Sequence, residues 1–175
     1  SIGVQHLAYD LDKISDSSTD NTPSITAPQA QLKFDMVFEK NSATRSTLEP
    51  GIFYVYRDAD AQTALPLFDT GLLTINRNQL TRDGAFSGYD RLEDTHQAAL
   101  YLTHRRFNAQ GQEMLAATIG QINYFQDAST ATNTLSRRNS DSDSSAIITD
   151  IEAKLSSQWQ SHITALWDAN DNQLE

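Results

Sequence analysis

Cysteine is absent from the 175 residues, which excludes a disulfide framework and a thiolate metal site. Basic residues are also scarce, because 13 lysines and arginines stand against 23 aspartates and glutamates, for a net charge of −10. Proteins that neutralise nucleic-acid phosphates need clustered basic residues, so the composition argues against nucleic-acid binding. The length indicates one domain or part of a larger one.

Long apolar runs are missing as well. No run approaches the roughly 20 residues that a transmembrane helix requires. Strands of a membrane barrel cross with about 10 alternating residues each, so a barrel remains open. The first residues show no basic segment followed by an apolar one, and we expect no signal peptide. They start in strand-like sequence, which predicts that the chain was cut from a longer one.

The sequence is rich in apolar and polar residues that alternate with a period of two, the pattern of β-strands. In QLKFDMVFE, for example, Leu32, Phe34 and Phe38 share one face, and Lys33 and Asp35 share the other. Helical spacing is weak throughout. We therefore predict an all-β, antiparallel up-and-down meander of about seven strands. The predicted strands are about 2–10, 30–39, 48–57, 96–107, 113–126, 146–155 and 158–168.

The predicted connections alternate in length. Long polar connections are expected at about 11–29, 58–95 and 127–145, and short turns at about 40–47, 108–112 and 156–157. In a meander, every second connection lies at the same end, so all the long ones share one end of the sheet. Outer-membrane barrels have this asymmetry. A soluble β-sandwich shows the same residue alternation, so the pattern by itself leaves both classes open.

Several uncommon segments follow one another between positions 48 and 126. A Leu-Glu-Pro strand start precedes a Tyr-Arg-Asp strand exit and a Phe-Asp-Thr segment. A cluster of Arg-Asp, Phe-Ser-Gly and Asp-Arg comes next, before a Gly-Gln-Ile strand that ends in aromatics. The segments lie at Leu48–Pro50, Tyr56–Asp58, Phe68–Thr70, Arg82–Arg91 and Gly120–Phe125.

In these segments the chain resembles the barrel domain of LptD, the lipopolysaccharide-assembly family of Gram-negative outer membranes. The resemblance implies that residues 1–175 are an internal fragment of a large outer-membrane β-barrel, a wall segment of the translocon that assembles lipopolysaccharide into the outer leaflet. It implies a lipoprotein plug, LptE, and a periplasmic bridge that includes LptA and reaches the barrel through an N-terminal domain absent here. The family's lateral gate lies between terminal strands, outside this segment.

The longest predicted connection, 58–95, is far longer than a hairpin needs, and such loops are usually functional or disordered. Arginines and aspartates in it can form charge-assisted hydrogen bonds, glycines such as Gly84 permit tight bends, and two aromatics can anchor it. We predict that it caps the extracellular mouth of the barrel, although a solvated loop without fixed structure is the alternative. The residues of this candidate cap are Arg57, Asp58, Asp69, Arg82, Asp83, Phe86, Gly88, Tyr89, Asp90 and Arg91.

No pattern predicts a catalytic, cofactor or metal site. DSDSSAIITDIE superficially resembles a calcium loop, but Ala146 stands where an EF-hand needs glycine and the flanks are strand-like. Looser divalent binding by this acidic loop remains a hypothesis. The histidines, which form no spaced partner set, are His6, His96, His104 and His162. The charged residues expected to line the interior are Lys33, Asp35, Glu39, Asp150, Glu152 and Lys154.

Four functional possibilities follow from the residue patterns and the resemblance together. The first is the transport role that the resemblance implies, without catalysis. The alternatives are another porin-like outer-membrane barrel, an outer-membrane hydrolase that uses serine and histidine on neighbouring strands, and a soluble β-sandwich binding module. No nucleophile motif supports the hydrolase. A soluble module would be expressed as a monomer without detergent, whereas a barrel segment would not.

Overall fold

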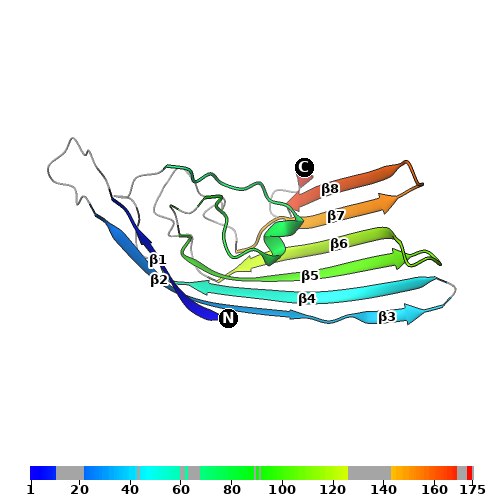
Figure 1. Ribbon diagram of the computed structural model, residues 1–175, viewed down its shortest axis with the longest axis horizontal. Helices are drawn as coiled ribbons and strands as arrows, with labels where there is room; N and C mark the ends of the chain where they lie inside the picture. The colour runs from blue at the N-terminus through cyan, green and yellow to red at the C-terminus, as the bar shows by residue number, and fades with distance from the viewer. Residues whose placement is uncertain are drawn as a thin grey trace.

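The computed structural model describes residues 1–10, 22–42, 44–59, 62, 68–88, 90, 92–125, 143–168 and 173–174. These residues form one antiparallel sheet in the order β1-β2-β4-β5-β6-β7-β8-β9, with β3 paired to β4 (Figure 1). The elements are β1 (Ile2–Ala8), β2 (Ser24–Asp35), β3 (Phe38–Asn41), β4 (Arg45–Arg57), the 3₁₀ helix η1 (Arg77–Thr81), β5 (Thr95–Phe107), β6 (Glu113–Tyr124), β7 (Ile147–Lys154), β8 (Gln160–Asp168) and β9 (Gln173–Leu174).

The predicted all-β antiparallel meander is confirmed. The strands among the described residues lie in one sheet that does not close on itself, with β1 and β9 at its edges. They form no second stacked layer of the kind that a β-sandwich requires. Within the described ranges, no helix is long and apolar enough to span a membrane.

The prediction of a connection through 11–29 is wrong for its last residues, because β2 begins at Ser24. Two features concealed this part of the strand. Pro28 has no N–H to donate, and the apolar positions Ile25 and Ala27 point to the face that is polar elsewhere. Pro28 still takes part in the pairing of β2 with the neighbouring chain segment, because its carbonyl accepts the N–H of Asp58 at 3.1 Å.

The predicted strand 30–39 is split into β2 and β3. Asp35 pairs with Gly51 and Phe38 with Leu48, so the register continues unchanged across the interruption. The ladder lapses opposite Pro50, which cannot donate, although its carbonyl still accepts the N–H of Met36 at 3.0 Å. The sequence did not predict the short β9. With these differences, the described part of the chain holds nine strands where about seven were predicted.

The register places the strand ends beside the long connections at one end of the sheet. Ala8 pairs with Ser24, and Arg57 pairs with Thr95, so the strands around the first two long connections end on the same side. Tyr124 pairs with Gln97 near that same end. The short turns leave from the opposite end (Figure 1). The predicted asymmetry of strand ends is therefore present. The turn at 108–112 is as predicted, while the others lie at 42–44 and 155–159.

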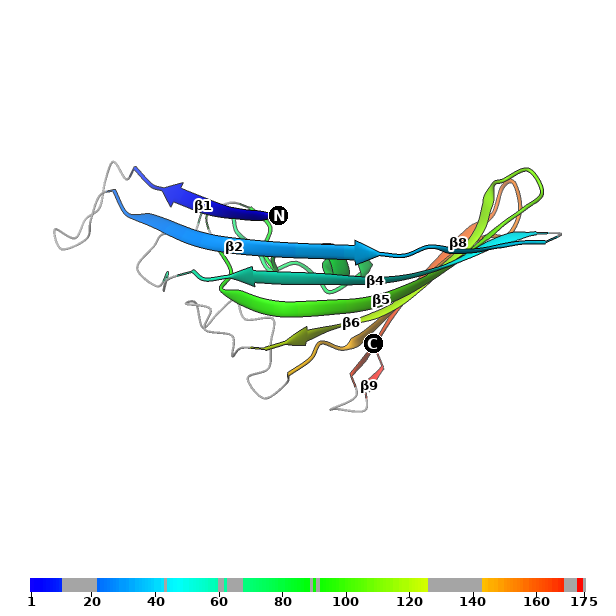
Figure 2. The ribbon, with the colours of Figure 1, turned by 90° about the horizontal axis from the view of Figure 1, so that it is seen from below.

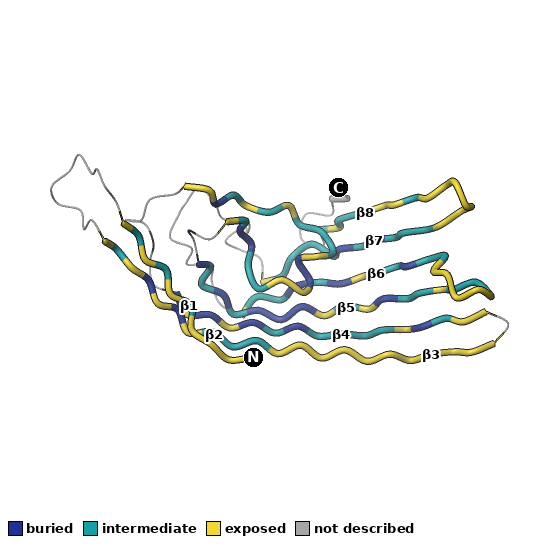
Figure 3. The backbone as a smooth tube through the Cα atoms, in the orientation of Figure 1, coloured by how far each residue is buried: buried dark blue, intermediate teal, exposed yellow. Residues whose placement is uncertain are grey.

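One face of the sheet, here called the outer face, is apolar and exposed. Leu32 pairs with Tyr54, and Ile151 pairs with Ile163, which aligns the apolar side chains of successive strands on this face. Figure 3 shows how exposed residues recur along the strands. The exposed large apolar side chains of this face are Ile2, Val4, Leu32, Phe34, Phe38, Leu48, Leu100, Leu102, Ile119, Ile163 and Trp167.

The other face, here called the inner face, carries the connection between β4 and β5. Figure 1 shows η1 over β5, β6 and β7, and Figure 2 shows the strands in front of the same segment when the sheet is seen from below. An apolar core lies between this connection and the sheet. Its buried members are Phe53, Val55, Leu80, Ala99, Ile122 and Ile148.

Candidate functional site

Residues 68–88, 90 and 92–94, here called the inner loop, are held by a side chain of η1, the only helix among the described residues. Leu80 of η1 is 2 % exposed and belongs to the buried core. It fits because Gly120 of β6 has no side chain; a Cβ there would lie 2.7 Å from Leu80 Cδ1 and 2.9 Å from the carbonyl oxygen of Leu100. Asn76 caps η1 through its side chain, which accepts the N–H of Asn78 at 2.9 Å.

Arg57, at the end of β4, fastens the second part of the inner loop. Its side chain is 5 % exposed and forms an ion pair of 3.0 Å with Asp83. The same guanidinium donates to the carbonyl of Asp83 at 3.1 Å and to Gln29 Oε1 at 3.0 and 3.2 Å. Gln31 adds a bond of 2.9 Å to the Asp83 carboxylate. A buried guanidinium with this many acceptors fixes the geometry of the loop.

Asp90 holds residues 68–70, which lie about twenty positions earlier in the chain, through its carboxylate. Its carboxylate accepts the N–H of Phe68 at 2.5 Å, the N–H of Asp69 at 3.3 Å and the hydroxyl of Thr70. Its carbonyl accepts the hydroxyl of Tyr9 at 2.6 Å. Burial by itself raises the pKa of Asp90, but the N–H groups of Phe68 and Asp69 stabilise the ionised form more, so the pKa lies below its ordinary value.

A short antiparallel bridge closes the inner loop on itself. Leu72 is bridged to Phe86, and the N–H of Ser87 donates to the carbonyl of Gly71 at 2.8 Å. Gly88 follows with a φ of 77°, a left-handed conformation that favours glycine. Any Cβ at Gly88 would also lie 2.7 Å from Asp69 Oδ1. Both the backbone conformation and the lack of space for a Cβ therefore favour glycine at this position.

The structure brings together most of the residues predicted for the cap. Arg57, Asp83, Asp90 and Gly88 take part in the contacts above, and Phe86 is buried in the loop.

Arg82 departs from the prediction: it is exposed and donates to the carbonyl of Phe86 at 3.4 Å rather than pairing with the aspartates. Asp58 is exposed at the strand end. Tyr89 and Arg91 lie outside the described residues, as does the 141 position of the calcium-like segment.

Sequence reasoning missed polar partners that hold the inner loop, two in the sheet and one within the loop itself. Gln29 and Gln31 of β2 reach Arg57 and Asp83, and Glu93 accepts the N–H of Ala85 at 2.5 Å. Gln29 lies opposite Arg57 in the register, so correct bounds for β2 would have placed both on the inner face. Without those bounds, Gln29 fell in the predicted connection 11–29, whereas Gln31 lay in the predicted strand 30–39 and was given no partner.

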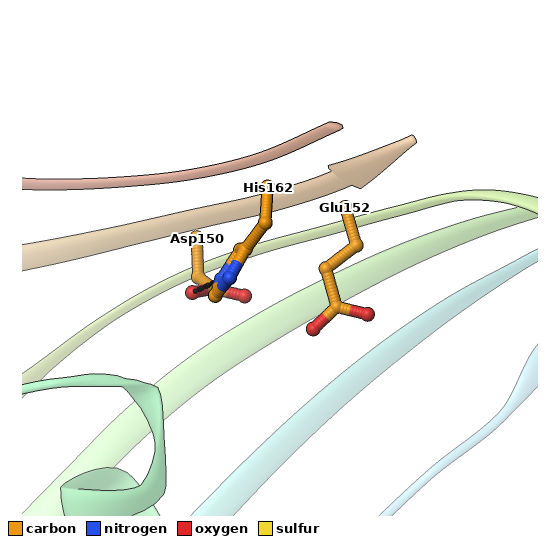
Figure 4. Close-up of side chains that lie close together, drawn as sticks. All are labelled: Asp150, Glu152 and His162. Carbon is orange, nitrogen blue, oxygen red and sulfur yellow. Dashed lines mark hydrogen bonds and ion pairs between the residues drawn. The ribbon is translucent and has the colours of Figure 1, made fainter. Parts of the chain in front are cut away.

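A second polar cluster lies on the inner face beside η1 (Figure 4). Asp150 and Glu152 project from β7, and His162 projects from β8 directly opposite Glu152. His162 Nε2 lies 2.8 Å from Asp150 Oδ2, and Thr164 donates to the same oxygen at 2.9 Å. Arg77 of η1 lies 3.5 Å from Asp150 and 3.6 Å from Glu152. Both carboxylates lie on the inner face, opposite the exposed apolar side chains, and that this face lines a barrel interior stays a prediction.

Comparison with known proteins identifies relatives over the same residues. The family described as LptD, LPS transport system D, matches residues 1–175. The LPS-assembly protein LptD of Nitrosococcus oceani is 35 % identical over 165 residues, 91 % of this chain and 22 % of that protein. The protein of the same name from Alcanivorax borkumensis is 32 % identical over 178 residues, 98 % of this chain and 23 % of that protein.

A third relative, the LPS-assembly protein LptD of Acinetobacter baylyi, is 30 % identical over 91 % of this chain and 19 % of its own length. The chain thus spans about a fifth of the length of the relatives it matches. A match over every residue, together with relatives above 30 % identity, shows the family. The chain belongs to the LptD family.

Proposed function

We propose that this chain is an internal wall segment of the C-terminal barrel of a lipopolysaccharide translocon, in the outer membrane of a Gram-negative bacterium. The observation that carries the proposal is the outer face, where apolar side chains on successive strands stand exposed in register. A soluble protein rarely leaves so continuous an apolar surface in water. β4 and β5 have 13 residues each, and a tilted strand needs about 9–11 to cross a bilayer.

The distribution of aromatic side chains on the outer face supports the same placement. Tyr54, Tyr56 and Phe125 surround His96 near the end that carries the long connections, with ring centroids 5.1–5.7 Å from the imidazole. Exposed Trp159 lies near the short-turn end. Aliphatic residues such as Leu100 lie between them. Aromatic girdles on both sides of an aliphatic band are typical of outer-membrane barrels.

The relatives are named for LPS assembly, which supports lipopolysaccharide as the transported ligand. On this proposal the barrel acts without catalysis, LptE plugs it, and LptA delivers lipopolysaccharide through an N-terminal domain outside this chain. The inner loop would narrow the lumen from within. Support for that role is its packing on the inner face, with buried Leu80 and Arg57 as anchors.

Photo-crosslinking at two neighbouring residues of β7 tests the transport proposal in the full-length protein. Lys154 points to the inner face and Ala153 to the outer face, near the short-turn end. A photoreactive residue at 154 should crosslink lipopolysaccharide in growing cells, whereas one at 153 should contact lipids of the inner leaflet instead. Equal crosslinking from both positions, or crosslinking from 153 alone, would contradict a luminal path.

Deletion of residues 82–91 tests the loop's role separately. The deleted barrel should admit bulky antibiotics that the intact outer membrane excludes. The control is the amount of folded protein and of surface lipopolysaccharide, both of which should remain near normal. Unchanged permeability in a normally folded deletion variant would contradict the proposal that the loop closes the lumen.

A further inference from the structure

The cluster of Asp150, Glu152 and His162 has the composition and spacing of a cation site. Asp150 and Glu152 are two residues apart on β7, and Glu152 pairs with His162 of β8. One potential ligand atom from each side chain lies within 4.8 Å of the others. Because the side chains project from paired strands, the sheet itself fixes their separation, and Figure 4 shows them on the same side of the two strands, with His162 turned toward Asp150 and Glu152 beside them.

Asp150 supplies a second observation. Its side chain is 5 % exposed, and its Oδ1 is buried and accepts no hydrogen bond. Arg77 Nη1 lies 3.5 Å from this oxygen, which is longer than the roughly 2.7–2.9 Å of a charge-assisted hydrogen bond. A buried carboxylate oxygen without a hydrogen bond is costly, and a coordinated cation removes that cost.

The charges at the cluster do not balance. Asp150 and Glu152 carry two negative charges, and Arg77 contributes one positive charge at 3.5 and 3.6 Å. The Arg77 side chain is 36 % exposed, so solvent weakens its electrostatic attraction to the two carboxylates. A divalent cation would neutralise both carboxylates at once.

We propose that Asp150, Glu152 and His162 bind a divalent transition-metal cation of the Zn²⁺ type, which takes the place of the Arg77 guanidinium. One imidazole nitrogen and two carboxylates form a ligand set that suits Zn²⁺ and leaves a fourth position for water. His162 is 59 % exposed on its side chain, so a cation can approach from the lumen side. Because Arg77 belongs to η1, cation binding and this contact of the inner loop exclude one another.

Zn²⁺ competition against a chromophoric chelator tests the site in the full-length protein in detergent. His162→Ala and Glu152→Gln should each weaken the binding of one Zn²⁺ at least tenfold, on the order of a lost or disturbed ligand. Arg77→Gln should strengthen it by about tenfold, because a competing positive charge is removed. The matched control is His104→Ala, whose imidazole lies on the outer face against the carbonyl of Thr47.

Limited proteolysis gives a second readout that does not depend on transport. Saturating Zn²⁺ should increase cleavage within residues 68–88 in the wild-type protein and should leave the His162→Ala variant unchanged. Zn²⁺ binding that is equal in the wild type and His162→Ala, or that is absent even in Arg77→Gln, would overturn the site. An affinity that Arg77→Gln leaves unchanged or lowers would overturn the competition. None of these results depends on lipopolysaccharide, so the transport proposal stands or falls separately.

Discussion

The inner face divides into two halves that the same alternating pattern built differently. In the half beneath the inner loop, Phe53 and Val55 are buried and apolar, and Arg57 is buried with all its bonds directed at the loop and at Gln29. In the half near the short turns, Arg105 pairs with Glu49 at 3.1 Å and with Glu113 at 2.7 Å, and these side chains are partly exposed.

The difference shows how a loop packed on one face of a sheet restricts the side chains that this face can carry. Beneath a loop, each position needs an apolar side chain or a complete set of hydrogen bonds, because water cannot supply the missing partner. Beside open solvent, polar and charged residues suffice. Substitutions in the covered half should therefore cost much more than substitutions in the open half.

The largest effect is expected for Arg57→Met. The variant removes the guanidinium donor from two backbone carbonyls, from Gln29 and from the Asp83 carboxylate, which keeps its bond from Gln31. Breaking a buried ion pair lowers the free energy of unfolding by about 3–5 kcal/mol. We expect about 3 kcal/mol here, because Asp83 is partly exposed to water. Urea unfolding in detergent measures it. Arg106→Met, at an exposed position of β5, is the control and should change little; equal losses in the two variants would contradict the comparison.

Gly120→Val should be the next largest. The added side chain would overlap Leu80 and the carbonyl of Leu100, which forces η1 away from the sheet. Overpacking of this kind costs about 1–3 kcal/mol. Faster proteolysis of residues 68–88 should report the displaced loop, while Ala117→Val on the outer face of the same strand should be tolerated. Normal protection of the loop in Gly120→Val would show that Leu80 does not anchor it.

A smaller, pH-dependent effect is expected at Asp90. Its pKa is lowered in the folded protein, so its stabilising contribution is complete above the unfolded pKa of about 3.9 and is lost as the pH falls through the folded value. Protection of the inner loop from an acid-active protease should thus decline below about pH 4. Asp90→Asn should lower protection at neutral pH and flatten the acid dependence. The exposed Asp58→Asn should behave as the wild type does.

The smallest effect is expected in the open half. Arg105→Ala removes ion pairs to Glu49 and Glu113 whose partners are 25 % and 36 % exposed. Partly solvated pairs contribute about 0–1 kcal/mol and weaken with salt. Urea unfolding at low and high salt measures this contribution. A loss as large as that of Arg57→Met would show that the open half is buried in the intact protein.

The strands were largely predictable because one face of the sheet must be uniformly apolar. The alternation around Leu32 and Ile151 fixed which residues point outward, and the register agrees. Prediction failed where a proline removed a donor or where the inward side was itself apolar, as at Ile25 and Ala27 beneath a buried cluster with Leu92. A period-two pattern reveals a strand when one face is apolar and the other is polar. Beneath the inner loop both faces carry apolar side chains, so the alternation disappears.

The site was predictable in composition but not in pairing. Arg57, Asp83 and Asp90 were singled out by charge and by the family's motif, whereas the preference of Asp83 for Arg57 over its neighbour Arg82 depends on where β4 ends. The cluster at His162 was invisible in the sequence, since its members come together only through the pairing of β7 with β8.

By itself the sequence determined the strands, the side of each that avoids water and the family, because these depend on residue types at short spacing. Tertiary structure decided that the long connection returns to the inner face, which guanidinium becomes buried and which carboxylates meet an imidazole. Those outcomes depend on strand register and on burial, which join residues far apart in the chain.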